Sequence, residues 1–281
     1  MIGITSTKSS SLAISPESGE LAYAAGSIII LYNPKSNKQS RYLLTKTNKS
    51  INCLSFSSCG KYLCAGESSC RFPLIYIWDL SQRASEPSPD PHPHAYSQDS
   101  TQRAVLNTGP RLLQKGHKFS VNLVQFSQRS SYVLSVGDQN ELKLNLWDFI
   151  TGNKLVSARF KSQIRDLCFF DDSSFVSVAS ACVKFWTIQS QSVHNVRSEI
   201  QDQFEKEKEK EEKIEIALKS KNADLVKMKE KVFVAVQVSG NRVFLLTEDG
   251  ILCVVNQNKQ LEKWMELKVI QQYIYLFSLL F

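Results

Sequence analysis

Residues 116–148 read GHKFSVNLVQFSQRSSYVLSVGDQNELKLNLWD, and this stretch decides the fold. Positions 121–127 alternate apolar and polar side chains and end on an aromatic residue, which is typical of a half-buried strand. A small polar turn at 128–131 leads into a second strand at 132–137, and a third strand ends in Trp147-Asp148. The stretch therefore predicts consecutive antiparallel strands joined by tight turns.

The same pattern recurs along the chain. Strands that begin at positions 51 and 164 are followed by polar turns, second strands and third strands that end in Trp78-Asp79 and Trp186-Thr187. An N-terminal copy ends in Tyr32-Asn33, and a degenerate copy occupies 233–238, 242–246 and 251–256. When two segments of foreign composition are removed, the copies repeat with a period of about 40 residues.

A period of about 40–45 residues with four strands and a Trp-Asp ending is the signature of a WD40 β-propeller blade. The Gly116-His117 pair matches the other half of that signature, and only this copy carries both halves. We expect His117 to bond a turn carboxylate or hydroxyl and the Trp147 indole N–H. On this interpretation the histidine, tryptophan and aspartate residues of the signature maintain the fold. They are His117, Trp78, Asp79, Trp147 and Asp148. Five recognisable copies predict an all-β, incomplete propeller whose end blades expose sheet edges.

Two insertions divide the repeats. Residues 1–195 are assigned to blades one to four, and the inserted segment 81–110, rich in Ser and Pro, is predicted to be a disordered surface loop. Residues 196–231 are dense in charge and lack Pro and Gly, so pairs such as Glu215 and Lys219 predict a charged helix. That helix would be either a solvated crossing over the rim or a partner-binding, coiled-coil arm. A degenerate fifth blade is expected over 232–269, followed by an aberrant apolar tail over 270–281.

Composition points to the cytoplasm. The chain has 281 residues, 42% of them hydrophobic, and a net charge of +7. Its seven cysteines form no framework pattern and no Cys-x-x-Cys pair, which favours a reducing compartment. The N-terminus lacks the apolar core of a signal peptide, and the apolar run at 273–281 is too short to span a bilayer. We therefore expect no membrane association.

Motifs for catalysis or cofactor binding are missing from the sequence. It contains no phosphate-binding loop, no dinucleotide fingerprint and no nucleophile elbow, so we expect no enzyme activity, no cofactor and no metal site. His92 and His94 are flanked by Pro, and Asp171-Asp172 is interpreted as a turn. Ser88-Pro89 is a minimal proline-directed phosphorylation site. A propeller-type enzyme and a basic surface that binds nucleic acid stay open as alternatives, and no partner-binding residue can be singled out.

A family resemblance covers residues 1–269 apart from the insertions. The runs IGITSTKSS (2–10), LAYAAG (21–26), NPKSNKQ (33–39), 56–66, 116–118, 144–148, 183–186, 250–253 and 261–267 resemble those of the mitogen-activated protein kinase-binding WD-repeat scaffolds. That family includes a spindle-pole member.

The resemblance implies tandem propellers in a longer protein, and protein partners in kinase signalling or at spindle poles and centrosomes. This chain departs from the family pattern in its longer Ser/Pro/His loop, its charged insertion and its sequence after Lys268. The family's kinase-docking region lies beyond the propellers, so the resemblance does not carry direct kinase binding over to this chain.

Overall fold

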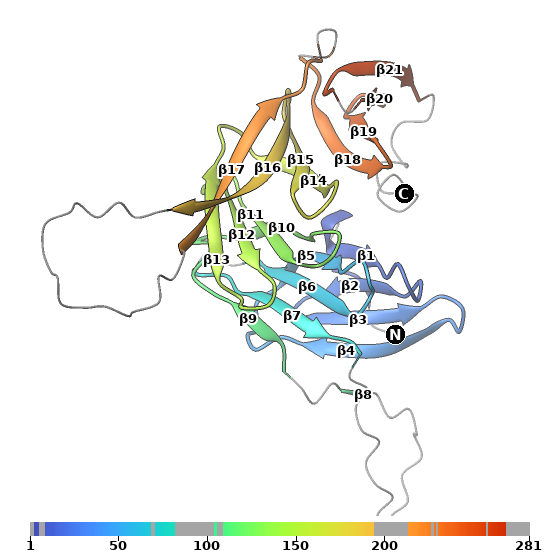
Figure 1. Cartoon of the computed structure of the whole chain (residues 1–281). Coiled ribbons are helices and arrows are strands. Elements are labelled where there is room, and N and C mark those ends of the chain that lie inside the picture. Colours follow the sequence, from blue (N-terminus) through green and yellow to red (C-terminus); the bar gives the residue numbers. More distant parts are fainter. Residues whose placement is uncertain are drawn as a thin grey trace, which may run out of the picture.

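The structure is a computed structural model that describes residues 3–5, 9–68, 71–81, 104–105, 109–193, 213–225, 228, 230–256 and 258–267. Its strands form five sheets, each built around four antiparallel strands, and a short fifth strand joins the edge of the first sheet in parallel. In Figure 1 the sheets fan out in chain order, with the first (blue) and the fifth (orange to red) at the two ends of the arc. This arrangement confirms the predicted all-β propeller architecture.

The elements follow one order in every blade. Blade 1 contains a short 3₁₀ helix (Ser9–Ser11) and strands β1 (Leu12–Ile14), β2 (Leu21–Ala25), β3 (Ile28–Asn33) and β4 (Lys38–Leu44). Blade 2 contains β5 (Ile51–Phe56), β6 (Tyr62–Glu67), β7 (Ile75–Asp79) and β9 (Arg111–Leu113). Blade 3 contains β10 (Val121–Phe126), β11 (Tyr132–Gly137), β12 (Lys143–Asp148) and β13 (Lys154–Arg159). Blade 4 contains β14 (Ile164–Phe169), β15 (Ser174–Ala179), β16 (Cys182–Val193) and β17 (Lys213–Asn222). Blade 5 contains β18 (Phe233–Ser239), β19 (Arg242–Thr247), β20 (Ile251–Val255) and β21 (Leu261–Glu266).

The polar residue at the end of the third strand caps the turn that follows it. Asp148 Oδ1 accepts a hydrogen bond from the Thr151 backbone N–H at 2.6 Å. In blade 1, which lacks Trp-Asp, Asn33 Oδ1 accepts one from the Lys35 N–H at 2.9 Å. Asn256 accepts the Gln260 N–H in the same way in blade 5, and in blade 2 Asp79 accepts the Ser81 N–H where the inserted segment begins. The sequence alignment of the copies therefore corresponds to one recurring local structure, in which a short side-chain acceptor satisfies turn N–H groups.

Apolar clusters between neighbouring blades form the core. One cluster joins blades 1 and 2, others join blades 2 and 3 and blades 3 and 4, and a fourth joins blades 4 and 5. Because both faces of a sheet are covered, strand β3 is apolar without alternation: Ile29, Ile30 and Leu31 are all fully buried. Each blade is thus stabilised mainly by the hydrophobic surface that its neighbour removes from water.

The prediction of a helix within 196–231 is wrong for the part of this segment that the structure describes. Lys213–Asn222 forms β17, which pairs antiparallel with β16 from Lys184↔Asn222 to Val193↔Lys213. Apolar residues at 214, 216 and 218 recur at the strand period of two, and Ile216 and Leu218 pack against the cluster between blades 3 and 4. This burial outweighs the weak helical charge pairs. Figure 1 shows the hairpin reaching past the other strands of its sheet.

Most of the predicted 81–110 loop, the whole predicted tail and part of the charged insertion lie outside the described residues. Of the 81–110 loop, the described strand β8 (Ala104–Val105) pairs in parallel with Arg41 and Tyr42 at the edge of blade 1, so this portion is ordered. Residues 82–103 and 106–108, the apolar tail over 270–281, and positions 194–212 of the charged insertion lie outside the described ranges.

Candidate functional site: the central cavity and its supporting network

A buried histidine ties together three segments of blade 3. His117, in the loop before β10, is only 2% exposed. Its Nε2 lies 2.8 Å from Ser135 Oγ on β11, and its Nδ1 lies 3.2 Å from Glu141 Oε2 in the turn before β12. The Trp147 indole N–H donates to the same Ser135 hydroxyl at 2.8 Å. The predicted bonds to a hydroxyl and a carboxylate are confirmed, but the direct bond expected between His117 and the Trp147 indole N–H is wrong, because Ser135 lies between them and accepts the indole proton.

The geometry assigns the protons of this network. Ser135 Oγ accepts from the Trp147 indole, so its own hydroxyl proton is available to His117 Nε2, which leaves Nδ1–H to donate to Glu141. Burial acts to raise the pKa of Glu141, but the hydrogen bond from His117, the Lys118 backbone N–H and the charge of Lys143 hold that pKa below its ordinary value. Glu141 therefore acts as an ionised anchor for the loop that carries His117.

Gly116 is next to His117 for a steric reason. A Cβ atom at this position would lie 2.2 Å from Cζ2 and 2.7 Å from Cη2 of the Trp147 ring. Only a residue without a side chain leaves room for the indole to reach Ser135. The Gly-His half of the signature thus describes a packing requirement as well as a hydrogen bond.

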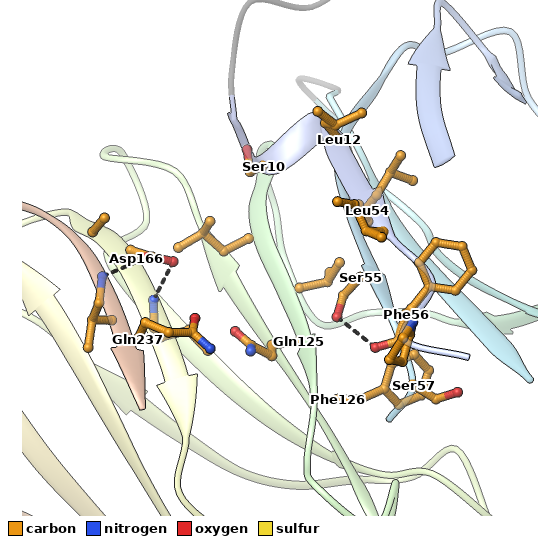
Figure 2. Close-up of a pocket in the computed structure, with 18 of the residues that line it drawn as sticks. Ser10, Leu12, Leu54, Ser55, Phe56, Ser57, Gln125, Phe126, Asp166 and Gln237 are labelled. Carbon is orange, nitrogen blue, oxygen red and sulfur yellow. Dashed lines mark hydrogen bonds between the residues drawn. The ribbon is translucent and has the colours of Figure 1, made fainter. Parts of the chain in front are cut away.

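The first strands of all five blades surround a central cavity of about 350 Å³. Figure 2 shows Leu12 and Leu54 on one side, and Gln125 and Gln237, from β10 and β18, across from them. Ser55 also lines the wall. Among the described residues that line the cavity, Arg165 and Asp166 on β14 are the members with an ionisable side chain. Apart from these two, the wall offers apolar surface with neutral amide and hydroxyl groups.

Asp166 links the inner strands of blades 4 and 5. Its Oδ2 accepts the Val236 backbone N–H at 2.8 Å, and its Oδ1 accepts the Leu167 N–H at 2.8 Å, as the dashed lines in Figure 2 mark. Burial raises the pKa of Asp166 to about 7, although both backbone N–H donors work in the opposite direction. The Asp166 carboxyl group therefore holds β18 against β14.

The raised pKa of Asp166 gives a pH-dependent stability. Between about pH 4 and pH 7 the folded chain keeps a proton that the unfolded chain has released, so the Asp166 contribution to the free energy of unfolding falls as pH rises. We expect Asp166→Asn, which resembles the protonated form, to remove this part of the pH dependence. Urea unfolding of both chains at about pH 5 and pH 8 measures it. Parallel pH profiles for the two chains would contradict the assignment.

The adjacent carboxylates Asp171 and Asp172 are turn residues, as predicted. Asp171 Oδ1 accepts from the Ser173 backbone N–H at 2.7 Å, within its own turn. Asp172 instead reaches the neighbouring blade and accepts from the Arg129 N–H at 2.8 Å and from Ser131 Oγ at 2.9 Å. The sequence analysis missed this second role, because the two turns come side by side only when neighbouring blades pack together.

Other candidates from the sequence are accounted for as follows. His92, His94, Ser88 and His194 lie outside the described residues. Across the ranges that are described, no three His, Cys, Asp or Glu side chains gather as metal ligands would, and no helix is long and apolar enough to cross a membrane. The sequence analysis did not single out Asp166, although a carboxylate within an inner strand that is apolar apart from Arg165 was a signal for it.

Comparisons with known proteins agree with the structure. The sequence model for the WD40 family, "WD domain, G-beta repeat", matches residues 38–72, which run from β4 of blade 1 into blade 2. WD repeat-containing protein 62 of Mus musculus is 30% identical over 96% of this chain and 15% of its own length. Mitogen-activated protein kinase-binding protein 1 of Homo sapiens is 27% identical over 97% of this chain and 16% of its own length. Cilia- and flagella-associated protein 52 of Chlamydomonas reinhardtii is 24% identical over 66% of this chain and 27% of its own length.

The chain thus spans about 15% of the length of the first two relatives. The repeat model, the relatives and the structure share one repeating unit, and the recurring caps, the His117 network and the five four-stranded sheets are its physical form. The chain belongs to the WD40-repeat family.

Proposed function

We propose that this chain is a non-catalytic protein-interaction scaffold, which binds proteins through the central cavity and the loops at its edges. The observation that carries the proposal is the composition of the cavity wall. Apolar side chains such as Leu12 and Leu54 alternate there with Gln125, Gln237 and Ser55, which can hydrogen-bond an extended peptide. Asp166 is engaged by two backbone N–H groups, which favours binding over bond chemistry.

A more specific proposal concerns the assembly in which this scaffold takes part and its location in the cell. Similarity to mitogen-activated protein kinase-binding protein 1 over 97% of the chain supports a place in a kinase-signalling assembly. Similarity to a cilia- and flagella-associated protein supports a cytoskeletal location. Together with the resemblance to scaffolds that include a spindle-pole member, this favours a cytoplasmic protein at centrosomes or spindle poles.

Affinity purification of the tagged full gene product tests the proposal. We expect crosslinked eluates from dividing cells to contain kinase-pathway or spindle and centrosome proteins. Gln237→Arg, which puts a long cation into the cavity, is expected to lower their recovery severalfold, whereas Ser36→Arg in the exposed turn after β3 leaves it unchanged. A bait-only background for the wild-type protein would contradict a scaffold role. Equal recovery with all three proteins would place binding elsewhere on the surface.

A further inference from the structure

The outer strand of blade 3 presents an open backbone edge. β13 is the last strand in its sheet, whose order is β10-β11-β12-β13 (Figure 1). Among the described residues, no backbone hydrogen bond joins β13 to a strand outside this sheet. The N–H and C=O groups along such an edge can pair with another extended segment. The backbone of β13 therefore offers a place for a further polypeptide strand.

The chain itself adds a strand at the corresponding place in blade 1. β4 is the fourth strand of that blade, as β13 is the fourth strand of blade 3. The short strand β8 pairs in parallel with β4 through Arg41↔Ala104 and Tyr42↔Val105. The geometry of a blade thus leaves room for a fifth strand at its outer edge.

Cations gather on one face of the β13 edge. Lys143 on β12 lies directly opposite Arg159 on β13, so both side chains leave the same face of the sheet. Lys154 is paired with Trp147, which lies four residues after Lys143 on β12, so Lys154 belongs to that face as well. Lys154 and Arg159 are exposed, and the β13 sequence KLVSAR contains no acidic residue. This edge is therefore positively charged.

The electrostatics of Lys143 shows that these charges lie within reach of one another. Burial lowers the pKa of Lys143 below its ordinary value, and repulsion by Lys154 and Arg159 adds to this effect. Lys118, which is exposed in the loop before β10, acts in the same direction. We call these four cations the basic edge: Lys118, Lys143, Lys154 and Arg159.

The carboxylate that reaches the basic edge is already engaged. Glu141 Oε1 lies 3.9 Å from Lys143 Nζ, while its Oε2 is held in the His117 network. Within the described ranges, no salt bridge joins the other members of the basic edge to a carboxylate. Like charges directly opposite each other, as Lys143 and Arg159 are, destabilise a sheet. A bound anionic group would relieve this repulsion.

We propose that an acidic segment of a partner protein adds to β13 as a further strand of blade 3, with Asp or Glu side chains at alternate positions paired with the basic edge. This inference rests on the proposed scaffold function and adds a second surface to the central cavity, together with the class of ligand that it takes. Backbone pairing supplies affinity, and the period of two puts every second carboxylate on the side of Lys154 and Arg159. The cations select acidic sequences and steer their approach.

A polypeptide fits this surface better than a nucleic acid does. The edge of β13 offers amide N–H and carbonyl groups at the spacing of a strand, which a second strand matches residue by residue. A single-stranded nucleic acid instead gains much of its affinity from bases that stack on aromatic rings. The side chains of β13 are Lys, Leu, Val, Ser, Ala and Arg, so this strand provides no ring for stacking.

Fluorescence anisotropy with the purified full chain tests the proposal, and the probe is a short fluorescein-labelled peptide of alternating Glu and Thr. We expect saturable binding that raised salt weakens. Two control peptides separate charge from strand pairing. In the first, Lys replaces every Glu. In the second, the central backbone amides are N-methylated, which keeps every charge but removes the N–H donors of a strand. Both are expected to bind about tenfold more weakly, or worse.

The Arg159→Glu variant separates binding from folding. It replaces a like-charge pair opposite Lys143 by an opposite-charge pair, so this chain is expected to unfold at the same or a higher urea concentration than the wild type. Its affinity for the Glu–Thr peptide is expected to fall about tenfold or more. Lys263→Glu is the matched control, because Lys263 is exposed on β21, the outer strand of blade 5, and the net charge changes equally. Its affinity is expected to change less than about twofold, since a distant surface charge is screened.

The proposal fails on any of three results. The first is equal affinity of the wild type and Arg159→Glu for the Glu–Thr peptide. The second is equal affinity of the N-methylated and unmodified peptides, which would show attraction of charge without strand pairing. The third is a fluorescent oligouridine that binds the wild type more tightly than the peptide does and loses this affinity with Arg159→Glu, which would assign the basic edge to nucleic acid.

Affinity purification from cells distinguishes this proposal from the scaffold function. Recovery of partners that Arg159→Glu lowers severalfold and Lys263→Glu leaves unchanged would support both. Recovery that Arg159→Glu leaves unchanged would keep the scaffold role and exclude the basic edge from it. A bait-only background for the wild-type protein would instead contradict the scaffold role itself.

Discussion

Trp147→Ala is expected to lower the free energy of unfolding by about 3–5 kcal/mol, the range for truncation of a large buried aromatic residue. The indole is 2% exposed and packs in the cluster between blades 2 and 3. Its removal opens a cavity there and takes from Ser135 the N–H that donates to its hydroxyl at 2.8 Å. The effect should therefore extend beyond the lost hydrophobic burial to the His117 network.

Urea unfolding followed by intrinsic fluorescence or circular dichroism measures this change. Trp264→Ala is the matched control, since Trp264 lies on the outer strand β21 and is 45% exposed. It is expected to change stability by no more than about 0.5 kcal/mol. A shift near zero for Trp147→Ala would show that this indole is not part of a core and would remove the basis for aligning the blades on it.

Gly66→Ala is expected to destabilise the chain by about 1–3 kcal/mol through overpacking between two blades. A Cβ at Gly66, near the end of β6, would lie 2.6 Å from Cγ1 and 2.7 Å from Cβ of Val121 on β10, and 2.8 Å from Cys53 Sγ. Val121 lies on the neighbouring blade and its short β-branched side chain has little freedom to turn away, so the two strands must shift apart. Thermal or urea unfolding measures the loss.

A second-site variant makes this prediction specific. Val121→Ala removes the two γ-methyl groups, one of which the new methyl would strike, so Gly66→Ala combined with Val121→Ala should be less destabilised than the sum of the single changes. Gly3→Ala is the control, because nothing lies within 4 Å of a Cβ built there. Additive effects of Gly66→Ala and Val121→Ala would mean that the contact with the Val121 γ-methyl group is not the cause of the loss.

Most strands of the fold could be predicted because their determinants are local. Alternation over 121–127 and the acceptor at Asp148 act within a few residues, and they define where a strand runs and where it turns. The His117 network could also be anticipated, since its residue types occur together in the signature. The error over Lys213–Asn222 arose because Glu215 and Lys219 fit a helix, while the neighbouring strand β16 decides the outcome. That pairing partner lies across an insertion and leaves no local mark.

The contacts that side chains make with neighbouring blades could not be predicted from the sequence. Asp166 bonds Val236, and Asp172 bonds Arg129, across blade boundaries.

The amino-acid order by itself determined the repeating unit: strand period, turn chemistry and the Gly-His and Trp-Asp pairs are short-range properties that each copy carries. Tertiary structure alone decided which faces touch, which carboxylates bridge blades and which aromatic rings stay in water. The physical reason is that packing between sheets and the burial of a charge depend on groups brought together from distant positions, and their free energies exceed the local preferences of any single segment.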